Sequence, residues 1–340
     1  MNKTEKNYLA SIKLLGEQVK QSFTEASLVK LPRAYRTIDK IMAGGMGGSQ
    51  LGVDLIKALF NKQLKLPIAQ VRNYQLPGFV NNKTLVFLIS YSGGTEEVLE
   101  LGRQAKKVKA KVVAITSGGK LAQLAKKNHW PVYNFKPLNN PSGQPRLGTG
   151  YTIGSLPAVL KKLNKIQINK SIMDKFTAAG LVSFQKYISS AKVSSLAKKL
   201  FGKIPVIVSA EHLAGNAHIM ANQIQESAKQ TALYFNLPEL NHHLLEGLAT
   251  PKSNRQNLYF LFFNSKDYYP KNQKRFSITA EVLKKQKIKF QQFEFSGQPV
   301  EQAAEVLVFG SLLSYELAKI NKVDPNRIPW VNYFKRRLYG

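Results

Sequence analysis

Short, apolar, β-rich runs alternate along this chain with segments of helical periodicity, and this alternation limits the folds open to it. The clearest run is Thr84–Ile89, which lies between an Asn-Asn pair and a Ser-Tyr-Ser-Gly-Gly loop. Residues 95–109 follow with Val98, Leu101 and Ala105 on one helical face. Because each helix returns the chain to the same edge of the sheet, successive strands pair in parallel. The pattern predicts doubly wound parallel sheets in an α/β protein.

The alternation occupies two stretches of the chain, separated by residues 153–200, which are helical in pattern. The strands expected in the first stretch are 40–43, 67–71, 84–89, 111–116 and 131–133. The helices expected there are 5–25, a helix that follows the loop ending at Ser49 and runs through residue 59, 95–109 and 120–127. The second stretch is expected to hold strands 204–209, 257–263 and 289–295, and helices through 229, over 273–286 and over 301–321. We therefore predict a first domain over 1–155, a helical connection over 156–200 and a second domain over 201–340.

Three features of the sequence indicate the cellular compartment of the protein. It contains no Cys, which excludes disulfides, thiolate nucleophiles and Cys-based zinc sites. No apolar run approaches the ~20 residues of a membrane span. Lys3, Glu5 and Lys6 interrupt the N-terminus where a signal peptide would be apolar. We expect a cytoplasmic protein that does not act in a membrane.

The formal net charge is +30, from 50 basic and 20 acidic residues. A basic surface can bind nucleic acid or small anionic ligands, or it can simply be solvated. The basic residues are spread along the chain, in pairs such as Lys106–Lys107 and Lys126–Lys127, and no helix-turn-helix, zinc-finger or basic-zipper pattern accompanies them. We therefore favour a solvated basic surface over a nucleic-acid footprint, which stays an alternative.

Two loops of small residues follow predicted strands: residues 44–51 read GGMGGSQL, and residues 90–97 read SYSGGTEE. Glycine lets the backbone approach a ligand, and the helix after each loop offers free N–H groups and the positive end of its dipole. Neither loop is a P-loop, and Gln50 stands where a dinucleotide fingerprint needs its third Gly. Ordinary turn chemistry could explain one loop. Two such loops in one domain indicate a site for a phosphomonoester.

The same residues carry a resemblance to a known family. SYSGGTEEVL resembles the Ser-x-Ser-Gly-x-Thr loop of sugar isomerase (SIS) domains, and the longer stretch VRNYQLPGFVNNKTLVFLISYSGGTEEVLE resembles that of the bifunctional phosphoglucose/phosphomannose isomerases. Further segments are similar to the same family, in its order: LLGEQV, GGMGGSQLGVDLI, TSGGKLAQLA, PSGQPRLGTGY, QIQESAK, LPELNHHLLEG and VDPNRIPWVNYFKRRL. The resemblance implies two SIS-type, flavodoxin-like domains and a dimer with shared active sites.

The resemblance also implies roles for individual residues. It assigns phosphate binding to Gly47, Gly48, Ser49, Ser90, Ser92 and Thr95. It assigns catalysis to Arg146, which faces the reacting carbons, Glu226 as base, His242 as the ring-opening group from the other subunit, and Lys335, which closes over the sugar. No cofactor is implied. The sequence departs from the family at Gln225 and Gly94, where Asn is usual, and at Ile328, where a small hydroxyl residue is usual.

Each catalytic assignment has a plainer alternative when the residues are taken alone. Glu226 could be a solvated carboxylate on a helix, and Arg146 a surface arginine after a Pro-Ser-Gly turn. His242 could belong to a loop pair with His243, and Lys335 to a solvated Lys-Arg-Arg run. The remaining histidines, His129, His212 and His218, have no carboxylate partners at ligand spacing, so we expect no metal site.

The expected activity is aldose–ketose isomerisation of glucose 6-phosphate and fructose 6-phosphate through an enediol. Such a reaction needs a base, a cation beside the developing enediolate and a ring-opening acid/base. A bulkier pocket at Ile328 predicts weaker action on mannose 6-phosphate. The alternatives are a phosphosugar sensor without catalysis and a basic RNA-associated protein on the same fold.

Overall fold

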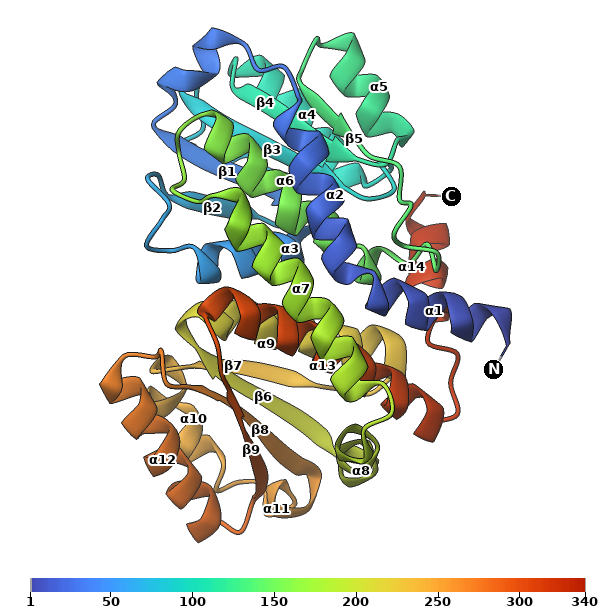
Figure 1. Cartoon of the computed structure of the whole chain (residues 1–340), viewed down its shortest axis with the longest axis vertical. Coiled ribbons are helices and arrows are strands. Elements are labelled where there is room, and N and C mark those ends of the chain that lie inside the picture. Colours follow the sequence, from blue (N-terminus) through green and yellow to red (C-terminus); the bar gives the residue numbers. More distant parts are fainter. Residues whose placement is uncertain (1, 340) are drawn as a thin grey trace.

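The computed structural model describes residues 2–339 and shows two α/β domains stacked on one another (Figure 1). The first is built on five parallel strands in the order β2-β1-β3-β4-β5. Their bounds are Lys40–Gly45 (β1), Ile68–Val71 (β2), Thr84–Ser90 (β3), Lys111–Thr116 (β4) and Val132–Asn134 (β5). This is the flavodoxin-like order, and it confirms the predicted doubly wound sheet.

The order of this sheet reverses between β1 and β3, which pair in parallel from Lys40↔Thr84 to Gly45↔Ile89. The chain passes outward from β1 to β2 and then crosses to β3 on the other side. At such a switch point the loops leaving the two strands diverge, and a crevice opens beyond their carboxyl ends. Both glycine loops predicted to bind phosphate leave the sheet at this crevice.

Helices cover both faces of the first sheet. One face packs under α4 (Glu96–Lys107) and α5 (Gly119–Lys127), which bury Val98, Leu101 and Leu121 against it. The sequence of α4 suits a helix, because its first turn is acidic and its last turn basic, which complements the helix dipole. The other face packs under α2 (Leu15–Ser27), α3 (Gly48–Leu59) and α6 (Thr149–Lys162).

The second domain has four parallel strands in the order β7-β6-β8-β9. Their bounds are Ile204–Ala210 (β6), Leu233–Leu237 (β7), Leu258–Ser265 (β8) and Lys289–Phe295 (β9). Its helices are α9 (Ala214–Gln223), α10 (Leu244–Gly247), α11 (Asn254–Asn257), α12 (Pro270–Lys285) and α13 (Pro299–Ile320). The buried residues of α13 extend over all its sides, so this helix lies inside the molecule, between the second sheet and α7.

The remaining α-helices belong to neither set. They are α1 (Lys3–Lys13), α7 (Lys170–Tyr187), α8 (Ala191–Leu200) and α14 (Pro329–Tyr339). α7 crosses from α2 in the first domain to α13 in the second, and the helices nearest the two termini, α1 and α14, lie on the same side of the molecule (Figure 1). The boundary expected at residue 155 falls inside α6, and the division into 1–155, 156–200 and 201–340 stays a prediction.

The structure differs from the sequence analysis in one predicted helix and in elements that were not predicted. The helix expected over 5–25 is two helices, because the chain breaks at Leu14. β7 was not expected, since this short edge strand has exposed residues at Leu233 and Tyr234 and lacks a buried apolar run. α14 was not expected as a helix either. Within residues 2–339, no helix has the length and apolar character needed to cross a bilayer.

Candidate active site

The first glycine loop turns directly from β1 into α3. Gly47 has φ +48, a left-handed conformation that favours glycine, and α3 begins at Gly48. The Ser49 hydroxyl accepts the backbone N–H of Tyr91 at 3.1 Å. This hydrogen bond ties the first loop to the Ser-rich loop, so the structure brings together the two segments predicted to form one phosphate site.

The second loop arranges its hydroxyls over the N-terminus of α4. Ser90 Oγ lies 2.8 Å from Thr95 Oγ1 and also accepts the Gly93 N–H at 3.0 Å. Ser92 Oγ accepts the Gly94 N–H at 3.3 Å. All three hydroxyls therefore lie on one turn beside free helix N–H groups, an arrangement suited to the oxygens of a phosphate.

A third loop closes the side of this crevice, and its role was not assigned from the sequence. It is Ser117–Gly119, between β4 and α5, where the Ser117 hydroxyl donates to Tyr91 O at 2.7 Å. A Cβ on Gly93 would lie 1.9 Å from Gly118 O, so only glycine fits the contact between the two loops. The signal was present in the sequence as a Ser-Gly-Gly after a predicted strand.

Arg146 lies next to the first loop, in the short 3₁₀ helix η2 (Pro145–Leu147). A Cβ on Gly48 would come within 2.9 Å of Pro145 O, which shows how closely this segment packs on the phosphate loop. The Arg146 side chain is almost fully buried, at 2% exposure. Its guanidinium donates to acceptors on three segments of the chain: Gln144 Oε1 (3.1 Å), Glu226 Oε2 (3.3 Å), Ser227 Oγ (3.2 Å), Asn326 O (3.1 Å) and Pro325 O.

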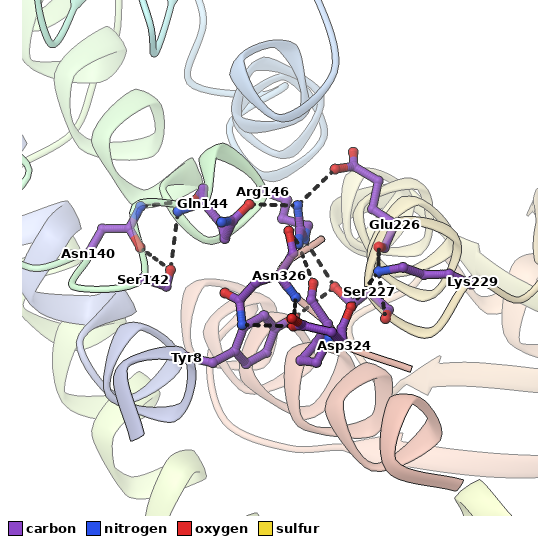
Figure 2. Close-up of polar contacts among 11 residues, drawn as sticks. Tyr8, Asn140, Ser142, Gln144, Arg146, Glu226, Ser227, Lys229, Asp324 and Asn326 are labelled. Carbon is purple, nitrogen blue, oxygen red and sulfur yellow. Dashed lines mark hydrogen bonds and ion pairs between the residues drawn. The ribbon is translucent and has the colours of Figure 1, made fainter. Parts of the chain in front are cut away.

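Glu226 lies at the end of α9, where the helix widens into one π-helical turn, η4 (Ile224–Ala228). Such turns redirect side chains and recur at functional sites. The carboxylate of Glu226 faces the Arg146 guanidinium and keeps about a third of its surface exposed (Figure 2). The arginine is buried and the carboxylate is open on one side. The pair therefore leaves space for a ligand to contact the carboxylate.

Two buried groups behind the pair were missed by the sequence reasoning. The Tyr8 hydroxyl donates to Ser227 Oγ at 2.7 Å, and the same oxygen accepts from Arg146 Nε (Figure 2). Burial raises the pKa of Tyr8, while the nearby Arg146 charge opposes that rise. Tyr8 therefore stays neutral, and its hydrogen bond orients the Ser227 hydroxyl whose oxygen also accepts from Arg146 Nε. Ser227 lies inside the QIQESAK segment, yet nothing in the sequence shows its partners.

His242 and Lys335 are not beside this pair in the described chain. His242 is exposed, in the 3₁₀ turn η5 (Glu239–His242) that follows β7. β7 ends level with β6, where α9 begins, whereas Glu226 follows the other end of α9, about 15 Å along a ten-residue helix. Lys335 is exposed on α14.

A cavity of about 490 Å³ lies between η2 and the start of α14. Gln144, Asn326, Ile328 and Arg336 are among the residues that line it. Gln144 and Asn326 also bind Arg146, so the cavity adjoins the Arg146–Glu226 pair. Residue 328, singled out from the sequence as a size determinant, is part of its wall.

Residues 2–339 contain no group of three or more His, Asp or Glu side chains that could hold a metal ion. The site itself presents hydroxyls and amides, a buried cation and a carboxylate that is about one third exposed.

Taken together, the two doubly wound sheets and the Ser-rich crevice define a protein of the SIS class. Residues 36–131 match the SIS domain family, and residues 190–338 match the family described as the bacterial phospho-glucose isomerase C-terminal SIS domain.

Full-length relatives identify the family. The chain is 28% identical to a bifunctional phosphoglucose/phosphomannose isomerase of Caldicellulosiruptor bescii, over 96% of this chain and 98% of that one. It is 30% identical to a protein of the same name from Aquifex aeolicus, over 87% of this chain and 83% of that one. The chain therefore belongs to the bifunctional phosphoglucose/phosphomannose isomerase family, and the resemblance stated from the motifs is confirmed.

Solved structures support the fold. The C-terminal domain of glucosamine-fructose-6-phosphate aminotransferase from Francisella tularensis superposes with a TM-score of 0.70 at 16% identity. The match covers 94% of this chain and 98% of that one.

Proposed function

We propose that this protein is a phosphosugar isomerase that interconverts glucose 6-phosphate and fructose 6-phosphate, and that also accepts mannose 6-phosphate. The observation that carries the proposal is the pairing of buried Arg146 with half-open Glu226 next to a hydroxyl-lined crevice. The names of its full-length relatives support the same substrate class.

The phosphate is assigned to the crevice between β1 and β3. Gly47, Gly48 and Ser49 contribute from one loop, and Ser90, Ser92 and Thr95 from the other. The phosphate is remote from the reacting carbons, so its binding energy can hold the sugar in place for the proton transfer.

The base is Glu226. Its carboxylate takes the proton from C2 of the open-chain aldose, the C–H electron pair forms the C1–C2 double bond, and the carbonyl π pair moves to O1, which gives an enediolate. The proton is then returned to C1 while the O2 hydroxyl proton moves to O1, so the C1–C2 double bond is lost and the C2 carbonyl of the ketose forms. Arg146 lies 3.3 Å from the carboxylate and stabilises the negative charge that develops on the sugar oxygen. Because its guanidinium is held by five acceptors, it needs little reorganisation as the charge forms.

Ring opening is assigned to His242 and Lys335. His242 lies beyond the opposite end of α9 from Glu226, so we assign it to the site of the other subunit in a homodimer. The exposure of both side chains supports roles that are completed by a partner subunit or by closure of α14 over the sugar. We also propose a cytoplasmic location, because a charged sugar phosphate crosses hydrocarbon only at high cost.

The test is conversion of fructose 6-phosphate to glucose 6-phosphate by purified protein, with Glu226→Gln as the matched variant. Loss of the base should lower kcat at least about 100-fold while fructose 6-phosphate still binds. Turnover that survives in Glu226→Gln would exclude this residue as the base. Binding without turnover by the wild-type protein would instead favour a phosphosugar sensor.

A further inference from the structure

We propose that Lys229 is a positioning residue for this reaction. Its ammonium group links the π-helical turn that carries Glu226 to the segment just before the C-terminal helix α14, and we call this link the tie. The inference rests on the proposed function, since it assigns a role in the same site. Its structural part can be tested without any activity.

The ammonium group of Lys229 joins two segments that are far apart in the sequence. It donates to Glu226 O at 2.7 Å and Ser227 O at 3.3 Å, which are carbonyls of the π-helical turn. It also donates to Asp324 O at 2.8 Å, in the segment between α13 and α14 (Figure 2). An ammonium has three N–H donors, and these three carbonyls use all of them.

The same segment is held from the other side by Arg146, which donates to Pro325 O and Asn326 O. Two cations therefore bind three successive carbonyls, one cation from each domain. Asn326 is followed within three residues by α14, which carries Lys335. A shift of this segment would move the base, the enediolate cation and the C-terminal helix relative to one another.

The backbone of Lys229 supports this assignment. It has φ +54 and ends the π-helical turn in a left-handed conformation, where glycine or asparagine is favoured over lysine. A glycine would terminate the turn at lower conformational cost. The lysine adds the ammonium group that caps the turn and reaches Asp324.

The three hydrogen bonds favour the charged form of Lys229, yet its pKa is lowered. Partial burial of the ammonium and the positive charge of Arg146 lower the pKa to about 8, and the carboxylates of Asp324 and Glu226 only partly oppose them. A neutral amine has two N–H donors and cannot bind all three carbonyls. The tie therefore weakens as the pH rises through about 8.

The experiment compares Lys229→Met with Lys203→Met, a matched control whose amine also binds a backbone carbonyl, Gln256 O at 2.7 Å, away from the site. Hydrogen exchange of residues 324–339 and steady-state kinetics with fructose 6-phosphate are both measured. Lys229→Met should speed exchange of this segment about tenfold and lower kcat about tenfold or more, because a small misplacement of reacting groups is costly. Lys203→Met should change neither.

Lys229→Gly distinguishes loss of the ammonium hydrogen bonds from backbone strain. It removes the ammonium group, but glycine adopts the left-handed conformation at lower cost. It should lose activity as Lys229→Met does. Lys229→Arg keeps a permanent charge, so it should retain kcat above pH 8 where the wild type declines. An alkaline decline of equal size in both proteins would overturn the need for a charged amine.

The outcomes separate the two proposals. Unchanged exchange in Lys229→Met would overturn the tie, whatever the kinetics show. Faster exchange with unchanged kcat would overturn the role of Lys229 in the reaction. If the wild-type protein does not turn over the sugar, the proposed function fails, while exchange of residues 324–339 still decides whether Lys229 holds the segment.

Discussion

The carboxyl edges of the two sheets share a topology and differ in chemistry. β3 and β8 occupy equivalent places, and each ends in a serine whose hydroxyl accepts a backbone N–H: Ser90 from Gly93, and Ser265 from Asp267. After β1 the chain reads Met-Gly-Gly-Ser, whereas after β6 it reads Glu211-His212-Leu213. One edge presents amides and hydroxyls, and the other presents carboxylates and an imidazole.

The polar groups of the second edge form hydrogen bonds with other residues of the same domain. Glu211 Oε1 accepts from Tyr269 N at 2.7 Å and from Asn272 Nδ2 at 2.8 Å. His212 Nε2 pairs with Gln302 Oε1 at 2.9 Å, and burial lowers the pKa of His212. A cavity of about 880 Å³ lies between this edge and the first domain, and Glu211 and Asp267 are among its lining residues. Lys57 and Lys62 line the same cavity from the first domain, so the carboxylates belong to the second edge itself and the two edges differ through their loops.

Arg146 and Glu226 come from neither edge. Arg146 belongs to the chain between β5 and α6, and Glu226 to the far end of α9. In the proposed function, the first sheet thus supplies the phosphate site, and the elements packed beside it supply the base and the cation. Four experiments test this division between the two edges and the elements beside them.

The largest effect is expected from mixing subunits. Glu226→Gln and His242→Ala proteins should each be nearly inactive alone. If the second edge of one subunit supplies His242 to its partner, random exchange should restore about a quarter of wild-type activity, because half the dimers are hybrid and each has one intact site. The measurement is fructose 6-phosphate turnover after proven exchange. No recovery would mean that both groups serve the same chain's site.

The next effect concerns the two equivalent serines. Ser90→Ala removes a hydroxyl from the phosphate crevice and should raise the KM for fructose 6-phosphate about tenfold or more, as expected for loss of a hydrogen bond to a charged group. Ser265→Ala makes the same change at the other edge and should leave KM unaltered. Equal changes in KM for the two variants would show that Ser90 contributes no more to substrate binding than Ser265 does.

A third experiment concerns the contact between the domains. Asp54 of α3 accepts hydrogen bonds from Arg72 at 2.6 Å, Gln70 at 2.9 Å and His218 of α9 at 2.9 Å. Burial opposes ionisation of Asp54, but the His218 hydrogen bond and the Arg72 charge outweigh it and lower the pKa. Asp54→Asn should lower the free energy of unfolding at pH 7 by about 1–3 kcal/mol, measured in urea.

The pH dependence of this effect follows from the direction of the shift. A carboxyl with a lowered folded-state pKa stabilises the protein above its unfolded pKa, and this stabilisation is lost as the pH falls through the folded value. The difference between wild type and Asp54→Asn should therefore shrink below about pH 4. A difference that persists there would show that it arises from packing and not from charge.

The smallest effect is expected at Ile328, in the wall of the 490 Å³ cavity. Ile328→Thr should raise kcat/KM for mannose 6-phosphate relative to fructose 6-phosphate by about 3- to 10-fold, the range expected for a small change in pocket shape. Val331→Thr, on the exposed part of α14, is the matched control. An equal change in both variants would place the selectivity outside this wall.

The strands and glycine loops of the first sheet could be predicted from the sequence because local chemistry defines them. A β-rich run followed by glycines and hydroxyls is visible without tertiary contacts, and β3 and β4 were placed almost to the residue. Short or exposed elements were missed, such as β7, whose edge position leaves Leu233 and Tyr234 exposed.

The supports of Arg146 could not be predicted, because they depend on distant contacts. Tyr8, Ser227 and Asn326 reach the site from three segments far from Arg146 in the sequence, and no spacing relates them. The family motifs indicated that Arg146 and Glu226 matter. The structure adds how the arginine is held, and the catalytic roles themselves stay proposals.

The span of the Arg146 contacts has a consequence during synthesis. Its hydrogen bond to Asn326 joins residues 180 positions apart, and its contacts to Glu226 and Ser227 also await the second domain. At the usual pace of translation, residue 326 follows residue 146 by roughly 9–36 s. A nascent chain can thus complete the phosphate crevice early, yet its guanidinium is fully held only when nearly all of the protein has been made.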